Sequence, residues 1–256
     1  LSTLPFWTDA NVAIEQVAAL GFVLSTTSGQ TDLATPASPS PRPLQLTLHG
    51  VSYQYKHEAD ERAFILGPLD LTFCSGELIF LTGGNGSGKT TLIKLLAGLY
   101  LPHTGVICLN GEPICDCNRT QYRQNFSAVF ADFYLFEQLL GLNPQNLERR
   151  GRAYLARLQL ERKVKVVDNQ LSTIDLSHGQ RKRLALLTAY LEDRPIYIFD
   201  EWAASQDPEF REVFYRQLLP ELKQRGKIVI VISHDDHYFD VADRLIKLDF
   251  GQIEVG

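Results

Sequence analysis

Short apolar runs separated by segments of helical periodicity fill the chain from about residue 44 onward. The runs at residues 196–199 and 228–232 are entirely apolar, which is typical of parallel strands buried on both faces. The run ELIFLTG at residues 77–83 has nearly the same character, so we expect it near the centre of the sheet. These patterns predict an α/β fold with a mixed central sheet.

Helices are predicted between these strands. Residues 88–99 have a helical pattern, residues 145–194 are mostly helical with charged faces, and residues 208–225 form a helix that an Asp-Pro pair opens. We therefore expect an α-helical insertion subdomain at about residues 131–185.

A second group of strands has mixed polarity. Residues 45–55 alternate apolar and polar positions and are interpreted as an edge strand, with further strands at residues 69–73 and 106–111. Residues 244–255 are predicted to form a closing hairpin. The sheet should therefore carry an antiparallel β edge.

The beginning of the chain differs from the rest. Residues 6–24 have helical periodicity, and residues 25–43 are polar and rich in proline, which is typical of a linker. We therefore divide the chain into residues 1–43 and a globular domain at residues 44–256. Because the chain starts with Leu1 and contains no methionine, we interpret it as a segment of a longer protein.

Composition narrows the possible functions. The 256 residues are 45% hydrophobic, enough for a sizeable core, and the net charge of −5 argues against a protein that coats nucleic acid. No apolar run approaches the roughly 20 residues that a membrane helix needs. The cysteines show no paired metal-ligand spacing, so Cys115 and Cys117 are expected to be ordinary free thiols in a surface turn.

The segment GGNGSGKT at residues 83–90 lies directly after a predicted strand and before a predicted helix. This context and spacing predict a phosphate-binding loop, in which glycines let backbone N–H groups approach phosphate oxygens and a helix N-terminus adds positive charge. Lys89 would contact the β- and γ-phosphates, and Thr90 would offer its hydroxyl to Mg²⁺. The expected nucleotide-binding residues are Gly83, Gly84, Asn85, Gly86, Ser87, Gly88, Lys89, Thr90 and Thr91.

Two acids follow the apolar run at residues 196–199. Asp200 ends the strand, as in the Walker B arrangement, and would hold Mg²⁺ directly or through water. Glu201 could reach a water aligned with the γ-phosphate and act as general base. A strand-end acid that merely caps the next turn is the alternative.

The segment LSHGQ at residues 176–180 precedes a predicted helix and, taken alone, is only a helix cap. In order with the two motifs above, however, it resembles the LSGGQ signature of the nucleotide-binding domains of ABC transporters. The resemblance covers roughly residues 44–255. It implies a P-loop NTPase fold and an ATPase that needs ATP and Mg²⁺.

Further roles follow from this resemblance. Tyr55 is similar to the aromatic residue that stacks on adenine, with Tyr53 as the second choice. Residues 204–207, which end in Asp207, match the D-loop, although DEWAASQD differs from the commoner DEATSALD. His234 matches the switch histidine that contacts the γ-phosphate and would join Glu201 and Lys89 as a catalytic residue.

The resemblance also implies a head-to-tail homodimer closed by ATP. In such a pair, Ser177, Gly179 and Gln180 of one copy would contact the nucleotide held by the other copy. One copy alone would then form an incomplete site.

One position departs from the family pattern. Alignment of the segment FSAVFADFYLF places Ala131 where the family usually has a glutamine that binds Mg²⁺. Asp132 follows directly and would substitute as an oxygen ligand of the metal.

The segments around these motifs resemble a narrower group, the bacterial cyclic-peptide and siderophore exporters of the pyoverdine and syringomycin exporter type. This implies a membrane-spanning domain fused upstream, a location at the cytoplasmic face of the bacterial inner membrane, and no nucleic-acid partner. Two alternatives stay open at this stage. One is a soluble ABC ATPase acting on nucleic acid or ribosomes, and the other is a regulatory nucleotide binder.

Overall fold

In a computed structural model of the chain, residues 43–55, 64–142 and 144–254 are described, within one compact unit. The predicted helix at residues 6–24 lies outside the described residues, as does the linker at residues 25–43 except for its last residue. The domain boundary near residue 44 therefore stays a prediction. Among the described residues, no helix combines the length and apolarity that crossing a bilayer requires.

The larger sheet has six strands in the order β12-β11-β3-β10-β9-β6. Its central strand β3 pairs in parallel with β10 and with β11, which confirms the central position predicted for residues 77–83. Only β12 runs antiparallel, in the predicted closing hairpin with β11. The strands are β3 (Leu78–Thr82), β6 (Phe126–Val129), β9 (Ile196–Asp200), β10 (Ile228–Ile232), β11 (Arg244–Asp249) and β12 (Gln252–Ile253).

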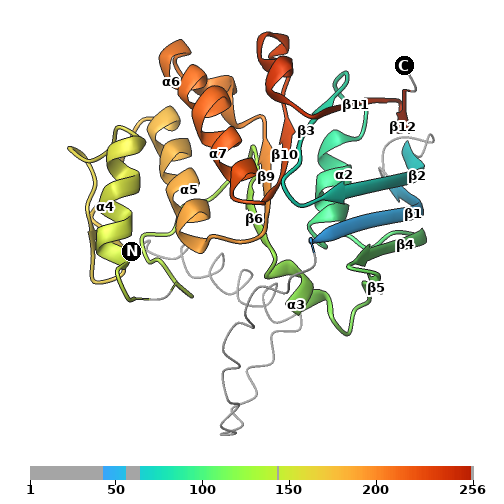
Figure 1. Cartoon of the computed structure of the whole chain (residues 1–256), viewed down its shortest axis with the longest axis horizontal. Helices are drawn as coiled ribbons and strands as arrows, with labels where there is room; N and C mark the ends of the chain where they lie inside the picture. The colour runs from blue at the N-terminus through green and yellow to red at the C-terminus, as the bar shows by residue number, and fades with distance from the viewer. Residues whose placement is uncertain (1–42, 56–63, 143, 255–256) are drawn as a thin grey trace, which may run out of the picture. The chain divides into compact units, whose positions relative to one another are not determined.

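Both faces of this sheet are covered at its centre, which is why β10 is apolar throughout and β3 and β9 are apolar up to their last residue. Alternate residues of β3 serve different cores, because successive side chains of a strand point to opposite faces. Phe80 belongs to the core cluster that includes residues of α5 (His178–Glu192), whereas Ile79 belongs to the cluster that includes residues of α2 (Lys89–Leu96). Figure 1 shows these two helices on opposite sides of β3, β9 and β10.

A smaller antiparallel sheet has the order β2-β1-β4-β5. Strand β1 (Gln45–Tyr55) lies between β2 (Phe64–Cys74) and β4 (Thr104–Leu109), with β5 (Glu112–Pro113) at the edge. The interpretation of residues 45–55 as an edge strand is therefore wrong. Their alternation reflects a strand with one covered face, since alternation reports the burial of faces and not the position in a sheet.

The helix predicted at residues 208–225 begins as expected and then changes its pitch. The backbone N–H of Phe210 donates to the Asp207 carboxylate at 2.9 Å, and Pro208 occupies the first turn. The helix runs through α6 (Pro208–Val213), the π-helical turn η2 (Phe214–Leu218) and α7 (Leu219–Gln224). Pro220 has no N–H to donate to the Arg216 carbonyl, so the preceding turn widens.

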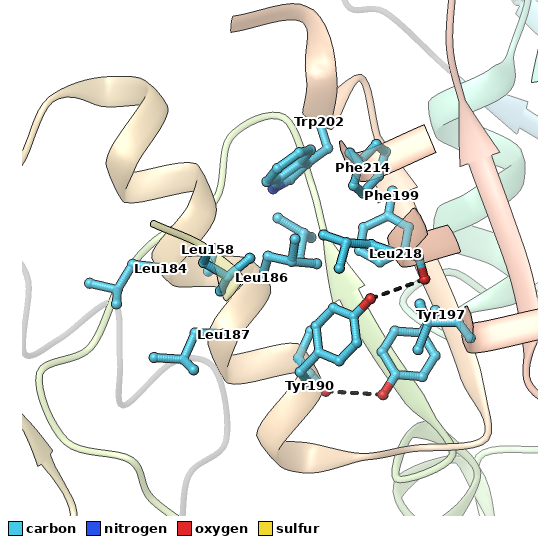
Figure 2. Packing of buried hydrophobic residues seen from close by; sticks show 14 of the residues in the cluster. Leu158, Leu184, Leu186, Leu187, Tyr190, Tyr197, Phe199, Trp202, Phe214 and Leu218 are labelled. Carbon is cyan, nitrogen blue, oxygen red and sulfur yellow. Dashed lines mark hydrogen bonds between the residues drawn. The ribbon is translucent and has the colours of Figure 1, made fainter. Parts of the chain in front are cut away.

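Aromatic packing fixes this helix against the sheet. Trp202 stacks on Phe214 with ring centroids 4.3 Å apart, and the Tyr190 hydroxyl donates to the Leu218 carbonyl at 3.2 Å (Figure 2). Burial raises the pKa of Tyr190 well above its usual range, so this hydroxyl stays protonated and keeps donating.

The segment between residues 131 and 185 is less helical than expected. It holds α4 (Leu147–Arg157), a two-stranded hairpin and the first half of α5. The hairpin joins β7 (Val166–Val167) to β8 (Gln170–Leu171) through Asp168 and Asn169, both with positive φ. Two helices therefore lie within residues 145–194 as expected, the hairpin between them was not predicted, and the Asp-Asn pair is the turn signal that indicates it.

The shorter elements complete the described chain. They are α3 (Arg119–Arg123) and the 3-10 helices η1 (Trp202–Ser205) and η3 (Asp236–Val241). Before α3, Cys115 and Cys117 are joined by a disulfide, so the expectation of free thiols is wrong for this pair.

Candidate nucleotide-binding site

The glycine-rich loop lies between the end of β3 and the start of α2, as predicted. Gly83 has φ of 139°, and a Cβ built there would lie 2.1 Å from the Leu248 carbonyl oxygen. Gly88 caps α2 with φ of 103°. Both positions need glycine, because the loop passes close to neighbouring atoms. The loop places the N-terminus of α2 at the carboxyl end of β3.

Lys89 extends back over this loop. Its Nζ donates to the carbonyl oxygens of Gly83 at 2.8 Å and Gly84 at 2.9 Å, and the residue is 6% exposed. Burial lowers the pKa of the Lys89 ammonium, while the carboxylates of Glu201 and Asp200 oppose this shift. The two loop carbonyls thus hold the Lys89 ammonium over the loop.

The residues at this loop fit a phosphate group. Within the described part of the chain, the buried Ser87 hydroxyl finds no hydrogen-bond partner. An unsatisfied buried polar group costs about 1–3 kcal/mol, so an anionic oxygen in the loop would remove a penalty as well as receive positive charge.

A pocket of about 490 Å³ opens above the loop. Tyr55 and Phe64 form one wall, and they face each other across the β1–β2 pair. Tyr53, the second choice for the adenine contact, instead stacks on Tyr100 with centroids 5.1 Å apart. Sequence reasoning missed Phe64, because its position beside the pocket depends on strand pairing. The remaining lining residues are Asn85, Gly86, Ser87, Gly88, Lys89, Thr90, Thr91 and Glu201.

Asp200 ends β9 and is 3% exposed. Burial raises the pKa of its carboxyl group, and the nearby charges of Glu201 and Asp132 raise it further. A backbone hydrogen bond from Ala131 to the carboxylate opposes these effects. The Asp200 and Asp132 carboxylates supply hard oxygen donors of the kind that Mg²⁺ prefers, and Mg²⁺ needs only one or two protein carboxylates. Ala131 and Asp132 thus lie close to the predicted metal position.

The backbone of Glu201 has an unusual conformation, with φ of 48°. Its N–H donates to the Ile232 carbonyl at 3.1 Å, and its own carbonyl accepts from the Lys182 Nζ at 3.1 Å. The Trp202 indole in turn donates to the Lys182 carbonyl at 2.9 Å. Helix α5 therefore holds the turn after β9 through Lys182, a residue that sequence reasoning missed. Left-handed backbone at a non-glycine residue costs of order 1–3 kcal/mol and is found where surrounding contacts enforce it.

His234 follows β10, the strand next to β9. Its Nε2 lies 3.2 Å from Oε1 of Glu201, and both side chains are partly exposed. Because parallel strands end at the same edge of a sheet, the two motifs meet although 33 residues separate them.

The part of the chain that holds the loop, the signature segment and both acids matches a known protein family. A family model described as ABC transporter matches residues 66–204. The chain belongs to the ABC transporter family. This confirms the ATPase class that the motifs indicate.

Solved structures confirm the ABC cassette fold, a P-loop NTPase. The dimeric structure of MJ0796, a bacterial ABC transporter cassette, is 23% identical, with a TM-score of 0.70 over 82% of this chain and 97% of that one. An ATP binding subunit of an ABC transporter is 26% identical, with a TM-score of 0.69 over 82% and 88% of the two chains.

Curated relatives differ in how much of their length this ABC chain covers. ATP-binding protein SyrD of Pseudomonas syringae pv. syringae is 51% identical over 213 residues, which are 81% of this chain and 37% of SyrD. An ATP-dependent lipid A-core flippase of Ralstonia nicotianae is 32% identical over 78% of this chain and 36% of its own length. Thiamine import ATP-binding protein ThiQ of Vibrio cholerae is 30% identical over 82% and 88%.

The signature segment of this ABC chain lies apart from the pocket. Ser177 caps α5 by accepting a hydrogen bond from the Gln180 backbone N–H at 3.4 Å, yet neither residue lines the pocket of the same chain. Gly179 and Asp207 are also absent from the pocket wall. The fold therefore brings Glu201 to the loop, Asp200 near Lys89 and His234 against Glu201, while none of the signature residues lines this pocket.

Proposed function

We propose that this ABC chain hydrolyses ATP as a head-to-tail pair and thereby drives export through a membrane-spanning domain. One observation carries the proposal. The loop and Glu201 line one pocket, and neither Ser177 nor Gly179 does. Asp200 lies close enough to Lys89 to influence its pKa, and His234 contacts Glu201. A second copy can supply the missing side of the site.

In this proposal, each residue in or beside the pocket has a defined role in binding ATP or in hydrolysis. The loop amides and Lys89 bind the phosphates, and Tyr55 stacks on the adenine ring. Thr90, Asp200 and Asp132 would hold Mg²⁺, which neutralises charge on the phosphate oxygens. Glu201 accepts the proton of the attacking water while the bond between the β- and γ-phosphates breaks, and His234 orients that carboxylate.

The partner copy contributes the start of its helix α5. Ser177, Gly179 and Gln180 lie at the N-terminus of a 15-residue helix, where N–H groups and the helix dipole favour an anion. Contact with the γ-phosphate across the pair would make ATP bind both copies at once. Hydrolysis would remove that bridge, and the copies would separate.

A membrane-spanning partner is supported by an exposed apolar surface. A pocket of about 300 Å³ lies beside the segment that follows β6, where Tyr134, Phe136 and Leu140 are each at least 68% exposed. The alignment covers only 37% of SyrD, so a protein as long as SyrD would have enough further residues for a membrane domain. We propose that a helix of this domain docks on the surface, that residues 1–43 lead to it, and that residues 44–256 form the ATPase domain. The location would be the cytoplasmic face of the bacterial inner membrane.

The cargo proposal rests on sequence alone. The 51% identity to SyrD, against 32% to a lipid A-core flippase, supports the predicted group of peptide and siderophore exporters. The cargo would therefore be a peptide or siderophore-like compound.

The paired mechanism is tested with the Glu201→Gln variant. We expect it to bind ATP, lose turnover and accumulate as a dimer in sedimentation with ATP and Mg²⁺. Adding Ser177→Arg should abolish this dimer and leave ATP binding by the monomer unchanged. A dimer that persists in the double variant would overturn the head-to-tail arrangement.

A further inference from the structure

Gln206 is a buried polar residue in the loop between η1 and α6. It is 5% exposed, and both ends of its side-chain amide are paired. Its Nε2 donates to the Gly179 carbonyl at 3.0 Å, and its Oε1 accepts from Nε of Arg183 at 2.9 Å. A single side chain thus bonds to two sites on the first turns of α5.

The loop and the start of α5 also touch directly. A Cβ at Gly179 would lie 3.1 Å from the Ser205 carbonyl oxygen. Arg183 forms an ion pair with Asp207 and lies 3.7 Å from the ring centre of Phe210. Gln206 therefore lies at the centre of a contact between the signature segment and the beginning of α6.

The signature segment depends on this contact because its own cap is weak. The Ser177 hydroxyl accepts from the Gln180 N–H at 3.4 Å, which is long for a hydrogen bond. The bond from Gln206 to Gly179 is shorter and is partly buried, which reduces competition from water. In the commoner DEATSALD pattern, leucine occupies the position of Gln206 and could make neither bond.

We infer that Gln206 is a positioning residue that holds the Ser177–Gly179 segment in the conformation that meets the partner's nucleotide. This inference rests on the proposed head-to-tail pair. It assigns to Gln206 an effect on pairing and turnover but none on ATP binding by one copy, because Gln206 does not line the pocket.

The test compares three variants in the Glu201→Gln background. Gln206→Leu removes both bonds and leaves the Gly179 oxygen and the Arg183 guanidinium with one partner fewer. Gln206→Glu keeps an acceptor for Arg183 but cannot donate to Gly179. Gln159→Leu is the matched control, because Gln159 also accepts from Arg183, at 3.1 Å, without touching Gly179.

Sedimentation with ATP and Mg²⁺ measures pairing, and a fluorescent ATP analogue measures binding by the monomer. We expect Gln206→Leu and Gln206→Glu to weaken pairing about tenfold, the size of one lost hydrogen bond. Monomer affinity should be unchanged, and Gln159→Leu should pair normally. If Gln206→Leu fails to fold in thermal unfolding, Gln206→Glu decides. Normal pairing by Gln206→Glu would overturn the inference.

Failure of the inference differs from failure of the proposed function. If the Glu201→Gln chain never forms a dimer that Ser177→Arg abolishes, the head-to-tail pair is wrong. If it does form that dimer and the Gln206 variants pair equally well, only the role of Gln206 is wrong.

Discussion

The imidazole of His234 and the carboxylate of Glu201 lie 3.2 Å apart, at the ends of adjacent parallel strands. In the proposed mechanism, this contact would let His234 orient Glu201 as the general base. We expect His234→Ala to lower the turnover number about 100-fold, at the lower end of what a positioned acid–base group contributes. ATP affinity should change little. Phosphate release under saturating ATP measures the effect, and an unchanged turnover number would contradict the assignment.

Lys89 is the cation held over the phosphate loop. Lys89→Ala removes the ammonium group that would contact the phosphates. The variant should therefore lose tight ATP binding. Equilibrium binding of a fluorescent ATP analogue checks this. Lys247→Ala is a suitable control, since Lys247 pairs with Glu254 and does not line the pocket. Equal affinity for both variants would refute the phosphate-binding role.

Lys182 supports Glu201 through the backbone and does not line the pocket. Lys182→Met keeps the bulk of the side chain and loses the hydrogen bond to the Glu201 carbonyl, so we expect turnover to fall about tenfold. The Michaelis constant for ATP should stay the same. Lys182→Arg can still donate and should recover part of the rate. A matching loss of ATP affinity would point to a role in binding instead.

Asp132 lies close enough to Asp200 to raise its pKa. If Asp132 binds Mg²⁺ in place of the missing glutamine, Asp132→Asn should raise the Mg²⁺ concentration for half-maximal ATPase activity several-fold, because a neutral amide is a weaker ligand. Asp116→Asn is the control, as Asp116 is exposed and pairs with Arg119. An unchanged Mg²⁺ requirement would remove Asp132 from the metal site.

Asp207 links stability to pH. The Phe210 N–H, followed by the charge of Arg183, holds the pKa of its carboxyl group below the usual 3.8. The resulting stabilisation is present above pH 3.8 and is lost as pH falls through the lower pKa of the folded state. Asp207→Ala should cost about 1 kcal/mol of unfolding free energy at pH 7, whereas Asp207→Asn keeps the cap and should cost less.

Urea unfolding at pH 7 and at pH 3 checks this prediction. The difference in unfolding free energy between the wild type and Asp207→Asn should shrink at the lower pH. A difference that stays constant would mean that the Asp207 charge does not contribute.

Much of the fold could be predicted because its signals are local. Strand β10 is apolar at every position and β9 is apolar up to Asp200, and the glycine-rich loop needs small residues where a Cβ would collide with the backbone. The cap at Asp207 depends on a hydrogen bond only three residues away. Each signal reports a constraint between near neighbours in the chain, so one sequence suffices to recognise it.

Other features were decided only by the tertiary structure. Strand β1 lies inside its sheet because β2 and β4 pair with it from both sides. Phe64 lies at the pocket because β2 pairs with β1. Lys182 and Gln206 contact Glu201 and Gly179 over separations of 19 and 27 residues. Lysine and glutamine are ordinarily exposed, so their burial and their partners depend on which helix packs against which strand end.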